Sequence, residues 1–235
     1  MALPLILAMT AAEMAGISNF AHQAAWMACH FSPWSLGLTN IPKSLPEGSI
    51  LILNDRLPCQ GHSPDLAAEQ LMDALSRLRC ESLLLDFQRP PEAESEAMVR
   101  FLLQVLPCPV AVSETYAKDS DCPVFLSPPA LHTLLQEHLA PWKNREVWLE
   151  AALCQEDIFI SEKGTTFVPR FPAEQLEGGF FDPELCCNYK TEVSSDQVRF
   201  TLFDTPESLK EKMKKAHALG VSRAVGLYQQ LQALS

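Results

Sequence analysis

Two residues near the middle of the chain combine a carboxylate and an amide at a spacing that suits ligand binding. Asp86 and Gln88 follow three consecutive leucines, Leu83–Leu85. An apolar run bounded by polar residues is typical of a strand buried on both faces of a parallel sheet. Residues two apart in a strand share a face, and polar groups at the carboxyl end of a barrel strand point into the mouth. The stretch therefore predicts a site with Asp86 as hydrogen-bond acceptor and Gln88 as both donor and acceptor.

Other apolar runs also end in polar residues, which are expected to reach the same mouth. These residues are Asp55, Glu114, Glu150 and Tyr228. Together with Asp86 and Gln88 they predict a polar pocket that binds a sugar or another hydroxylated ligand. Two alternatives stay open. Strand ends are often polar because they meet water, and Asp86 with Gln88 could form a closed hydrogen-bonded network in the core.

Glu114 or Glu150 is also a candidate acid or base beside Asp86. Paired carboxylates with separated pKa values are how hydrolases divide acid and base work. Each glutamate could instead be a structural acid, or could pair with Arg56 or Arg89.

Two further features suggest ligand contacts of other kinds. Trp34 lies in a loop after the second predicted strand, where its ring could stack on a sugar face. The spacing Cys59-x-x-His62 is compatible with zinc, and Cys29-His30 lies at the end of that second strand. No second close pair accompanies Cys59 and His62, and no glycine-rich phosphate loop occurs, so neither a metal nor a cofactor is expected.

Alternating apolar strands and amphipathic helices predict one α/β domain over residues 1–235, a (β/α)8 TIM barrel. The eight expected strands are 3–9, 25–31, 49–54, 82–88, 109–113, 124–127, 146–149 and 224–228. The expected helices are 11–22, 63–79, 98–106, 128–139 and 205–220. A hairpin at 157–168 and a strand at 198–203 are set aside as a small insertion before the last barrel strand. Residues 171–187 are expected to be irregular.

The helix expected at 205–220 begins with a start signal, Thr205-Pro206, and ends at a glycine. Its apolar residues are expected to face inward and its lysines to face solvent. The lysines are Lys210, Lys212, Lys214 and Lys215.

Composition narrows the class of protein. The 235 residues include 18 Lys and Arg against 29 Asp and Glu, a net charge of −11, which argues against nucleic-acid or membrane partners because both need basic patches. The apolar start at 1–7 lacks a basic flank and is too short to span a membrane, which predicts a cytoplasmic protein. The eight cysteines contain no C-x-x-C pair, so reduced thiols are expected. The oligomeric state is not indicated.

Two stretches resemble the family 18 glycoside hydrolases, the chitinase-like barrels, including the branch found in spore-germination and cortex proteins. Residues 81–88 are similar to the family's Asp-Gly-x-Asp-x-Asp-x-Glu on the fourth barrel strand. Residues 203–209, followed by Lys212 and Gly220, are similar to the Tyr-Asp-Asp-Pro-Glu-Ser-like segment that precedes the last strand. The resemblance implies a TIM barrel with an insertion near 157–168 and a ligand containing N-acetylhexosamine.

The chain departs from the family pattern at the residues that carry the family's chemistry. The resemblance implies a glutamic acid as proton donor, an aspartate that orients the substrate's N-acetyl group, and a second, inner acid. Here Gln88 replaces the donor and Leu84 the inner acid, while Asp86 keeps the orienting position. The family's Met-x-Tyr-Asp has no counterpart near 124–127, and its last-strand tryptophan is replaced by Leu227 or Tyr228, depending on the register.

Three hypotheses for function follow. The first is a non-hydrolytic, chitinase-like barrel that binds an N-acetylhexosamine-containing oligosaccharide or acts as a scaffold. The second is an active glycoside hydrolase with a relocated acid, using Asp86 with Glu114 or Glu150. The third is a protein-interaction module whose own loops, 34–46 and 171–187, close the barrel mouth. Whether the chain is an enzyme stays undecided on the sequence.

Overall fold

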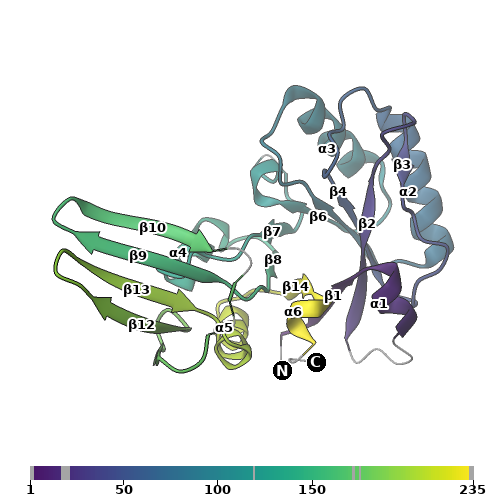
Figure 1. Ribbon diagram of the computed structural model, residues 1–235. Helices are drawn as coiled ribbons and strands as arrows, with labels where there is room; N and C mark the ends of the chain where they lie inside the picture. The colour runs from purple at the N-terminus through teal and green to yellow at the C-terminus, as the bar shows by residue number, and fades with distance from the viewer. Residues whose placement is uncertain (1–2, 17–21, 119, 171–172, 175, 233–235) are drawn as a thin grey trace.

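Eight parallel strands close into a barrel in the computed structural model, which describes residues 3–16, 22–118, 120–170, 173–174 and 176–232. The barrel strands are β1 (Leu5–Met9), β2 (Gln23–Phe31), β4 (Ile50–Asn54), β5 (Ser82–Asp86), β6 (Val110–Ser113), β7 (Val124–Leu126), β8 (Val147–Glu150) and β14 (Arg223–Leu227). The first strand, β1, pairs in parallel with both β14 and β2, and these pairings close the ring. The predicted α/β barrel is therefore confirmed (Figure 1).

Apolar runs form these strands because both sides of the barrel wall are buried. Leu84 of β5 points inward and joins Ile52 and Phe125 in the cluster that fills the barrel interior. Its neighbours Leu83 and Leu85 belong to a second cluster, between the wall and the surrounding helices. Successive side chains of a strand point to opposite faces, so one unbroken apolar run supplies both clusters.

Helices α2 (Pro64–Leu78) and α3 (Ala93–Val105) cover the barrel wall beside β4, β5 and β6. The predicted start of α2 is confirmed, since the Ser63 hydroxyl accepts the amide hydrogen of Leu66 and Pro64 occupies the first turn. Three helices are shorter: α1 (Ala11–Gly16), α4 (Leu135–Leu139) and α6 (Tyr228–Leu231). The expected helix 128–139 is thus only α4, and the end of the expected helix 11–22 lies partly outside the described residues.

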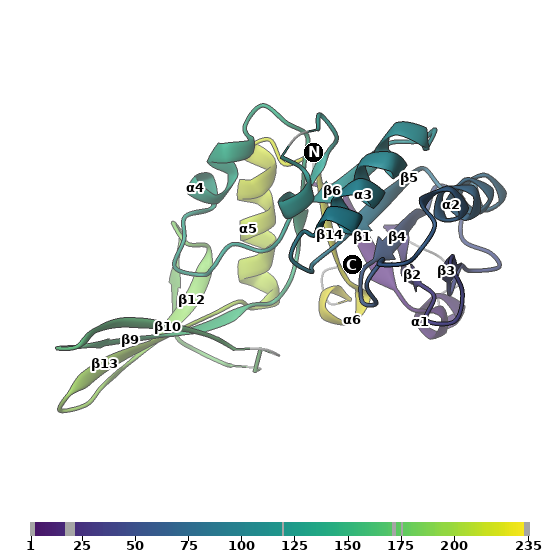
Figure 2. The same cartoon turned by 90° about the horizontal axis from the view of Figure 1, so that it is seen from above.

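The insertion between β8 and the last barrel strand is larger than the predicted hairpin. It is a five-stranded antiparallel sheet in the order β10, β9, β13, β12, β11. The strands are β9 (Gln155–Ser161), β10 (Gly164–Arg170), β11 (Phe180–Asp182), β12 (Cys187–Val193) and β13 (Gln197–Phe203). The sheet projects from the side of the barrel (Figure 1), and α4 and α5 (Pro206–Ala218) lie over one of its faces (Figure 2).

The hairpin and its partner strand were predicted correctly, and their neighbours were not. β9 pairs with β10 and also with β13, as expected for 157–168 and 198–203. The segment 171–187 is not wholly irregular, because β11 and the start of β12 lie in it. β11 has only three residues, too few to show the period of a strand. A short strand β3 (Leu38–Thr39) likewise pairs with β2 inside the predicted loop 34–46.

One lysine of α5 faces inward, contrary to the prediction. Lys212 is buried, and its Nζ lies 2.7 and 2.8 Å from the two carboxylate oxygens of Asp204. Asp204 follows β13 directly and also accepts hydrogen bonds from the backbone of Cys154 and the hydroxyl of Ser208. A buried carboxylate requires a charged or hydrogen-bonded partner, which explains why this lysine turns away from solvent. Lys210 and Lys214 are exposed as expected.

Among the helices that the structure describes, none is long and apolar enough to cross a membrane.

Candidate functional site

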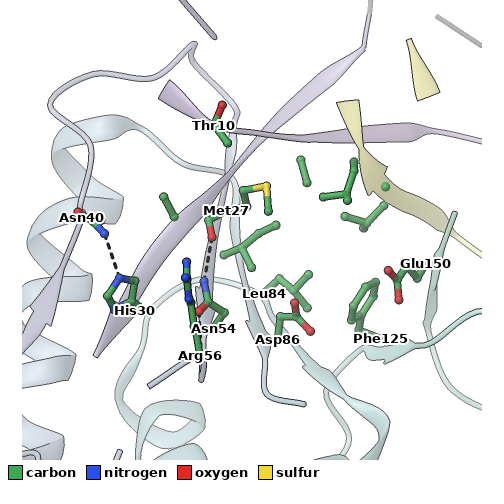
Figure 3. Close-up of a pocket in the computed structure, with 16 residues that line it drawn as sticks. Thr10, Met27, His30, Asn40, Asn54, Arg56, Leu84, Asp86, Phe125 and Glu150 are labelled. Carbon is green, nitrogen blue, oxygen red and sulfur yellow. Dashed lines mark hydrogen bonds between the residues drawn. The ribbon is translucent and has the colours of Figure 1, made fainter. Parts of the chain in front are cut away.

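A cavity of about 360 Å³ lies at the carboxyl ends of the barrel strands (Figure 3). Residues of β1, β2, β4, β5, β7, β8 and β14 line it, together with Asn40, Thr10 and Arg56 from the connecting segments. Its apolar side chains come from the barrel interior. The polar side chains that reach it are Thr10, His30, Asn40, Asn54, Arg56, Asp86 and Glu150.

Asp86 is the last residue of β5, and its half-buried carboxyl group lines the cavity. The Gln88 side chain, which is exposed beyond the strand end, donates from Nε2 to Asp86 Oδ1 at 2.5 Å. Burial raises the pKa of Asp86 above its usual value, and the nearby negative charge of Asp55 raises it further. The hydrogen bond from Gln88 acts in the opposite direction, because it stabilises the ionised form.

Glu150 ends β8 and presents a second carboxyl group to the cavity (Figure 3). Burial, followed by the negative charge of Asp86, raises the pKa of Glu150 from 4.5 to about 7. Near neutral pH this group therefore exists in both forms and can donate or accept a proton. The cavity thus combines one carboxyl group hydrogen-bonded to an amide and another held near its titration point.

The opposite side of the cavity carries nitrogen-bearing side chains. His30 Nδ1 lies 2.7 Å from the carbonyl oxygen of Phe31, which assigns the proton of a neutral ring to Nδ1. Its Nε2 then accepts from Nδ2 of Asn40 at 3.0 Å. Arg56 is exposed at the rim, and its guanidinium forms no ion pair with the residues that the structure describes. A ligand group with negative charge would find an unneutralised cation there.

Asn54 shapes the cavity through the backbone of β2. Its Nδ2 donates to the carbonyl oxygens of Met27 at 2.8 Å and Cys29 at 3.0 Å. These bonds span a register shift between Trp26 and Cys29, where β2 bulges against β4. A bulge re-aims side chains locally, and here Met27 and Ala28 line the cavity. Asn54 therefore acts on the site by positioning its wall.

The structure brings together only part of the predicted pocket. Asp86 and Glu150 share the cavity, with Gln88 bound to Asp86. Asp55 is buried and accepts the backbone amides of Gln88 and Arg89, each at 2.9 Å, so it holds the segment that carries Gln88.

Three other predicted ligand residues lie outside that cavity. Glu114 begins a short 3-10 turn (Glu114–Tyr116) and is half-buried, but it is not among the lining residues that the structure describes. Tyr228 is the first residue of α6, and Leu227 reaches the cavity in its place. Trp34 is 92% exposed and borders a second hollow.

Five lining residues were missed by reasoning from the sequence as ligand contacts: Thr10, His30, Asn40, Asn54 and Arg56. Four of them lie at or just after the end of a strand, and this position could have predicted that they reach the mouth. Asn40 follows the two-residue strand β3 and had no comparable signal.

The Cys59 and His62 pair makes no metal centre in the part of the chain that the structure describes. Both ring nitrogens of His62 face carbonyl oxygens, those of Cys59 and Ser32. No group of three or more metal-ligating side chains gathers among the described residues. All eight cysteines are free thiols.

The chain folds as a closed eight-stranded α/β barrel with an antiparallel sheet inserted, and this fold is similar to that of solved chitinase and family 18 glycoside hydrolase structures. Among solved structures, the chain is similar to the spore cortex-lytic enzyme SleL of Bacillus cereus, with a TM-score of 0.56 and 10% identity over 95% of this chain and 70% of that one. It is also similar to a chitinase from Chromobacterium violaceum, with a TM-score of 0.53 and 10% identity over 96% and 93%.

A family 18 N-acetylglucosaminidase from Paenibacillus barengoltzii matches with a TM-score of 0.51 and 9% identity, over 95% of this chain and 94% of that one. No protein-family model and no curated protein matches the sequence. At these identities the likeness concerns the fold, and the chemistry depends on the residues of this chain.

Proposed function

We propose that the barrel mouth binds a carbohydrate built from N-acetylhexosamine units and does not hydrolyse it by the family 18 mechanism. One observation carries the proposal: Asp86 lines an open cavity and is hydrogen-bonded to the amide of Gln88, where the family would place a proton-donating acid.

The lining chemistry supports a sugar ligand. Pyranose rings have apolar faces and hydroxyl edges, and binding sites of this kind combine apolar surface with a few directed polar groups. Here Leu84, Phe125 and Leu227 supply apolar surface, and Asp86 and Glu150 supply acceptors for hydroxyl or amide hydrogens.

The same residues argue against the family's reaction. A carboxamide has no proton to give at neutral pH, so Gln88 cannot protonate a leaving oxygen. Leu84 stands at the inner-acid position and lies among the apolar residues of the interior. A cavity at the mouth also favours binding over an interaction module whose loops fill that space.

Titration calorimetry with chito-oligosaccharides and peptidoglycan-derived oligosaccharides tests the proposal. The wild type is expected to bind at least one member of the panel, and Asp86→Ala to weaken that binding by roughly 10-fold or more, the effect of losing a hydrogen bond to a charged group. Glu162→Ala, at an exposed turn of the inserted sheet, is the matched control and should bind as the wild type. The absence of heat across the panel would contradict the proposal.

A second candidate is a glycoside hydrolase that uses Glu150 with Asp86. It is favoured by the pKa of about 7 for Glu150, which suits a general acid beside a second carboxylate. Glu114 lacks this support because it does not line the described cavity. This candidate requires turnover of an aryl glycoside that disappears in both Asp86→Ala and Glu150→Gln. No turnover over a wide pH range would eliminate it.

A further inference from the structure

One cationic side chain reaches the mouth cavity. Arg56 is the only lysine or arginine among the lining residues that the structure describes, and it lies on the side away from Glu150 (Figure 3). Its guanidinium forms no ion pair or hydrogen bond with a described residue. Five other arginines are paired with carboxylates: Arg77, Arg79, Arg170, Arg199 and Arg223. In a chain with 29 acidic and 18 basic residues, the charge of Arg56 therefore stays available to a ligand.

The other nitrogen-bearing side chains of the lining are occupied within the protein. His30 has one ring nitrogen on a backbone carbonyl oxygen and the other on the side chain of Asn40. Asn54 donates both hydrogens of its amide to backbone carbonyl oxygens of β2. A guanidinium carries several N–H donors and no acceptor. Arg56 therefore supplies most of the free N–H donors of the cavity, whereas Asp86 and Glu150 supply acceptors.

The backbone of Arg56 is fixed at the cavity wall. Its amide donates to Oδ1 of Asn54 at 3.1 Å, and Nδ2 of the same asparagine is bound to β2. The segment after β4 is thus tied to the bulge of β2, where Met27 and Ala28 line the cavity. Because the root of the Arg56 side chain is held in place before a ligand arrives, less conformational freedom is lost on binding.

We infer that Arg56 makes the mouth selective for acidic saccharides, which carry a carboxylate on or next to the N-acetylhexosamine unit. The inference rests on the proposed function. The planar guanidinium offers paired N–H groups that match the two oxygens of a carboxylate, and this contact is stronger than a hydrogen bond to a neutral hydroxyl. Asp86 and Glu150 accept hydroxyl or amide hydrogens and repel an anion, so the acidic substituent is directed to the Arg56 side. This division also orients the saccharide in the mouth.

The test compares acidic saccharides with neutral forms that otherwise match them. One pair is a tetrasaccharide of alternating N-acetylglucosamine and glucuronic acid, beside the same tetrasaccharide with its carboxyl groups reduced to alcohols. The other pair is N-acetylglucosaminyl-N-acetylmuramic acid, whose carboxylate belongs to a lactyl ether, beside its methyl ester. Titration calorimetry is done at about 0.1 M salt, where a Debye length of about 10 Å screens the distant acidic residues. The wild type is expected to bind the acidic member of at least one pair roughly 3- to 10-fold more tightly.

Substitutions of Arg56 assign the preference to its guanidinium. Arg56→Gln should remove the preference, so that the acidic form binds no more tightly than its neutral match. Arg56→Lys keeps the charge without the paired N–H groups and should retain part of the preference. Arg100→Gln is the matched control, because Arg100 is exposed on α3, outside the mouth, and its loss changes the net charge equally.

Chemical modification supplies an independent readout. Phenylglyoxal reacts with exposed guanidinium groups, and mass spectrometry of peptides locates the modified arginines. The preferred acidic saccharide is expected to protect Arg56 and to leave Arg100 reactive.

The inference is wrong if the wild type binds the acidic and neutral members of both pairs equally, if Arg56→Gln weakens both members alike, or if Arg100→Gln reduces the preference as much. Binding of the neutral saccharides in those cases leaves the proposed function intact. Failure of every saccharide to bind would overturn both.

Discussion

At the scale of single residues, the mouth is governed by two carboxyl groups with different partners. Asp86 is bound by an amide and Glu150 is held near its titration point by burial and by the charge of Asp86. Burial disfavours the ionised form, and a neighbouring negative charge adds to the effect. A substitution of either residue is therefore expected to shift the pKa of the other.

Replacement of Gln88 by glutamate tests how far the site is from hydrolysis. The Gln88→Glu side chain would stand against Asp86, where the amide now lies 2.5 Å away, so the two carboxyl groups would share a proton. We expect no turnover of fluorogenic N-acetylglucosamine oligomers, because Leu84 still occupies the inner-acid position. Turnover by this variant alone would mean that the chain is a hydrolase disabled chiefly at its donor.

The raised pKa of Glu150 predicts a dependence of stability on pH. The folded state binds the proton more tightly than the unfolded chain, so stability from this group is fully present below pH 4.5 and is lost as the pH rises towards about 7. At about 1.4 kcal/mol per pKa unit the loss is at most about 3.5 kcal/mol, reduced by contact with solvent.

Urea denaturation of the wild type and Glu150→Gln across this pH window measures the effect. In the variant the free energy of unfolding should fall less as the pH rises. The remaining, smaller fall is the contribution of Asp86, whose pKa is also raised. Glu162→Gln, at an exposed position, should keep the wild-type profile. If the free energy of unfolding depends on pH in the same way in the wild type and in Glu150→Gln, the raised pKa of Glu150 is contradicted.

At the scale of elements, β13 and α5 are joined by an ion pair that solvent does not reach. The side chains of Lys212 and Asp204 are 5% and 0% exposed. Thr205 and Ser208 cap the same helix start, so the turn between strand and helix is held by several hydrogen bonds at once. This junction connects the inserted sheet to the helix that precedes the last barrel strand.

Removal of one partner should be strongly destabilising. Lys212→Met leaves the Asp204 carboxylate buried without its cation, which is expected to cost about 3–5 kcal/mol. Lys214→Met, whose side chain is 71% exposed, is the control and should change stability by less than about 0.5 kcal/mol. Urea denaturation distinguishes them. The double variant Lys212→Met with Asp204→Asn should recover part of the lost stability. Equal stability of Lys212→Met and Lys214→Met would contradict a stabilising role for the buried ion pair.

At the scale of the whole molecule, the barrel and the inserted sheet differ in how they are buried. Strand β5 is paired on both sides and Leu83, Leu84 and Leu85 are at most 1% exposed. Among the strands that the structure describes, β10 pairs only with β9, and all residues of β10, Gly164–Arg170, are exposed. Local opening free energies follow such differences in burial and hydrogen bonding.

Hydrogen exchange is expected to separate these regions. Hydrogen-bonded amides of β10 should exchange through local opening, orders of magnitude faster than those of β5, which require global unfolding. Mass spectrometry of peptides covering both strands measures the rates. Equal protection would mean that sheet and barrel open as one cooperative unit.

Local patterns were sufficient for the barrel strands and for the starts of α2 and α5. The runs at 82–88 and 49–54 are apolar because both faces of the wall are buried, and the caps at Ser63 and Thr205 act within a few residues. The inserted sheet was only partly predictable. The segment 187–193 carries asparagine, lysine and glutamate, which are uncommon in strands, and pairing with β13 decides its conformation.

The sequence by itself placed Asp86 at the carboxyl end of a buried strand, because an unbroken apolar run that ends in a polar residue marks such a strand. The strand ends at Asp86, so the contact of Gln88 with Asp86 depends on the loop that Asp55 holds. The sequence also placed Glu150 at a strand end. Only the tertiary structure decided which strand ends meet at one cavity, since Asp55, Glu114 and Glu150 have equivalent local patterns and differ in where their side chains are directed. The inward turn of Lys212 was decided in the same way, by a buried carboxylate eight residues earlier whose charge requires a partner.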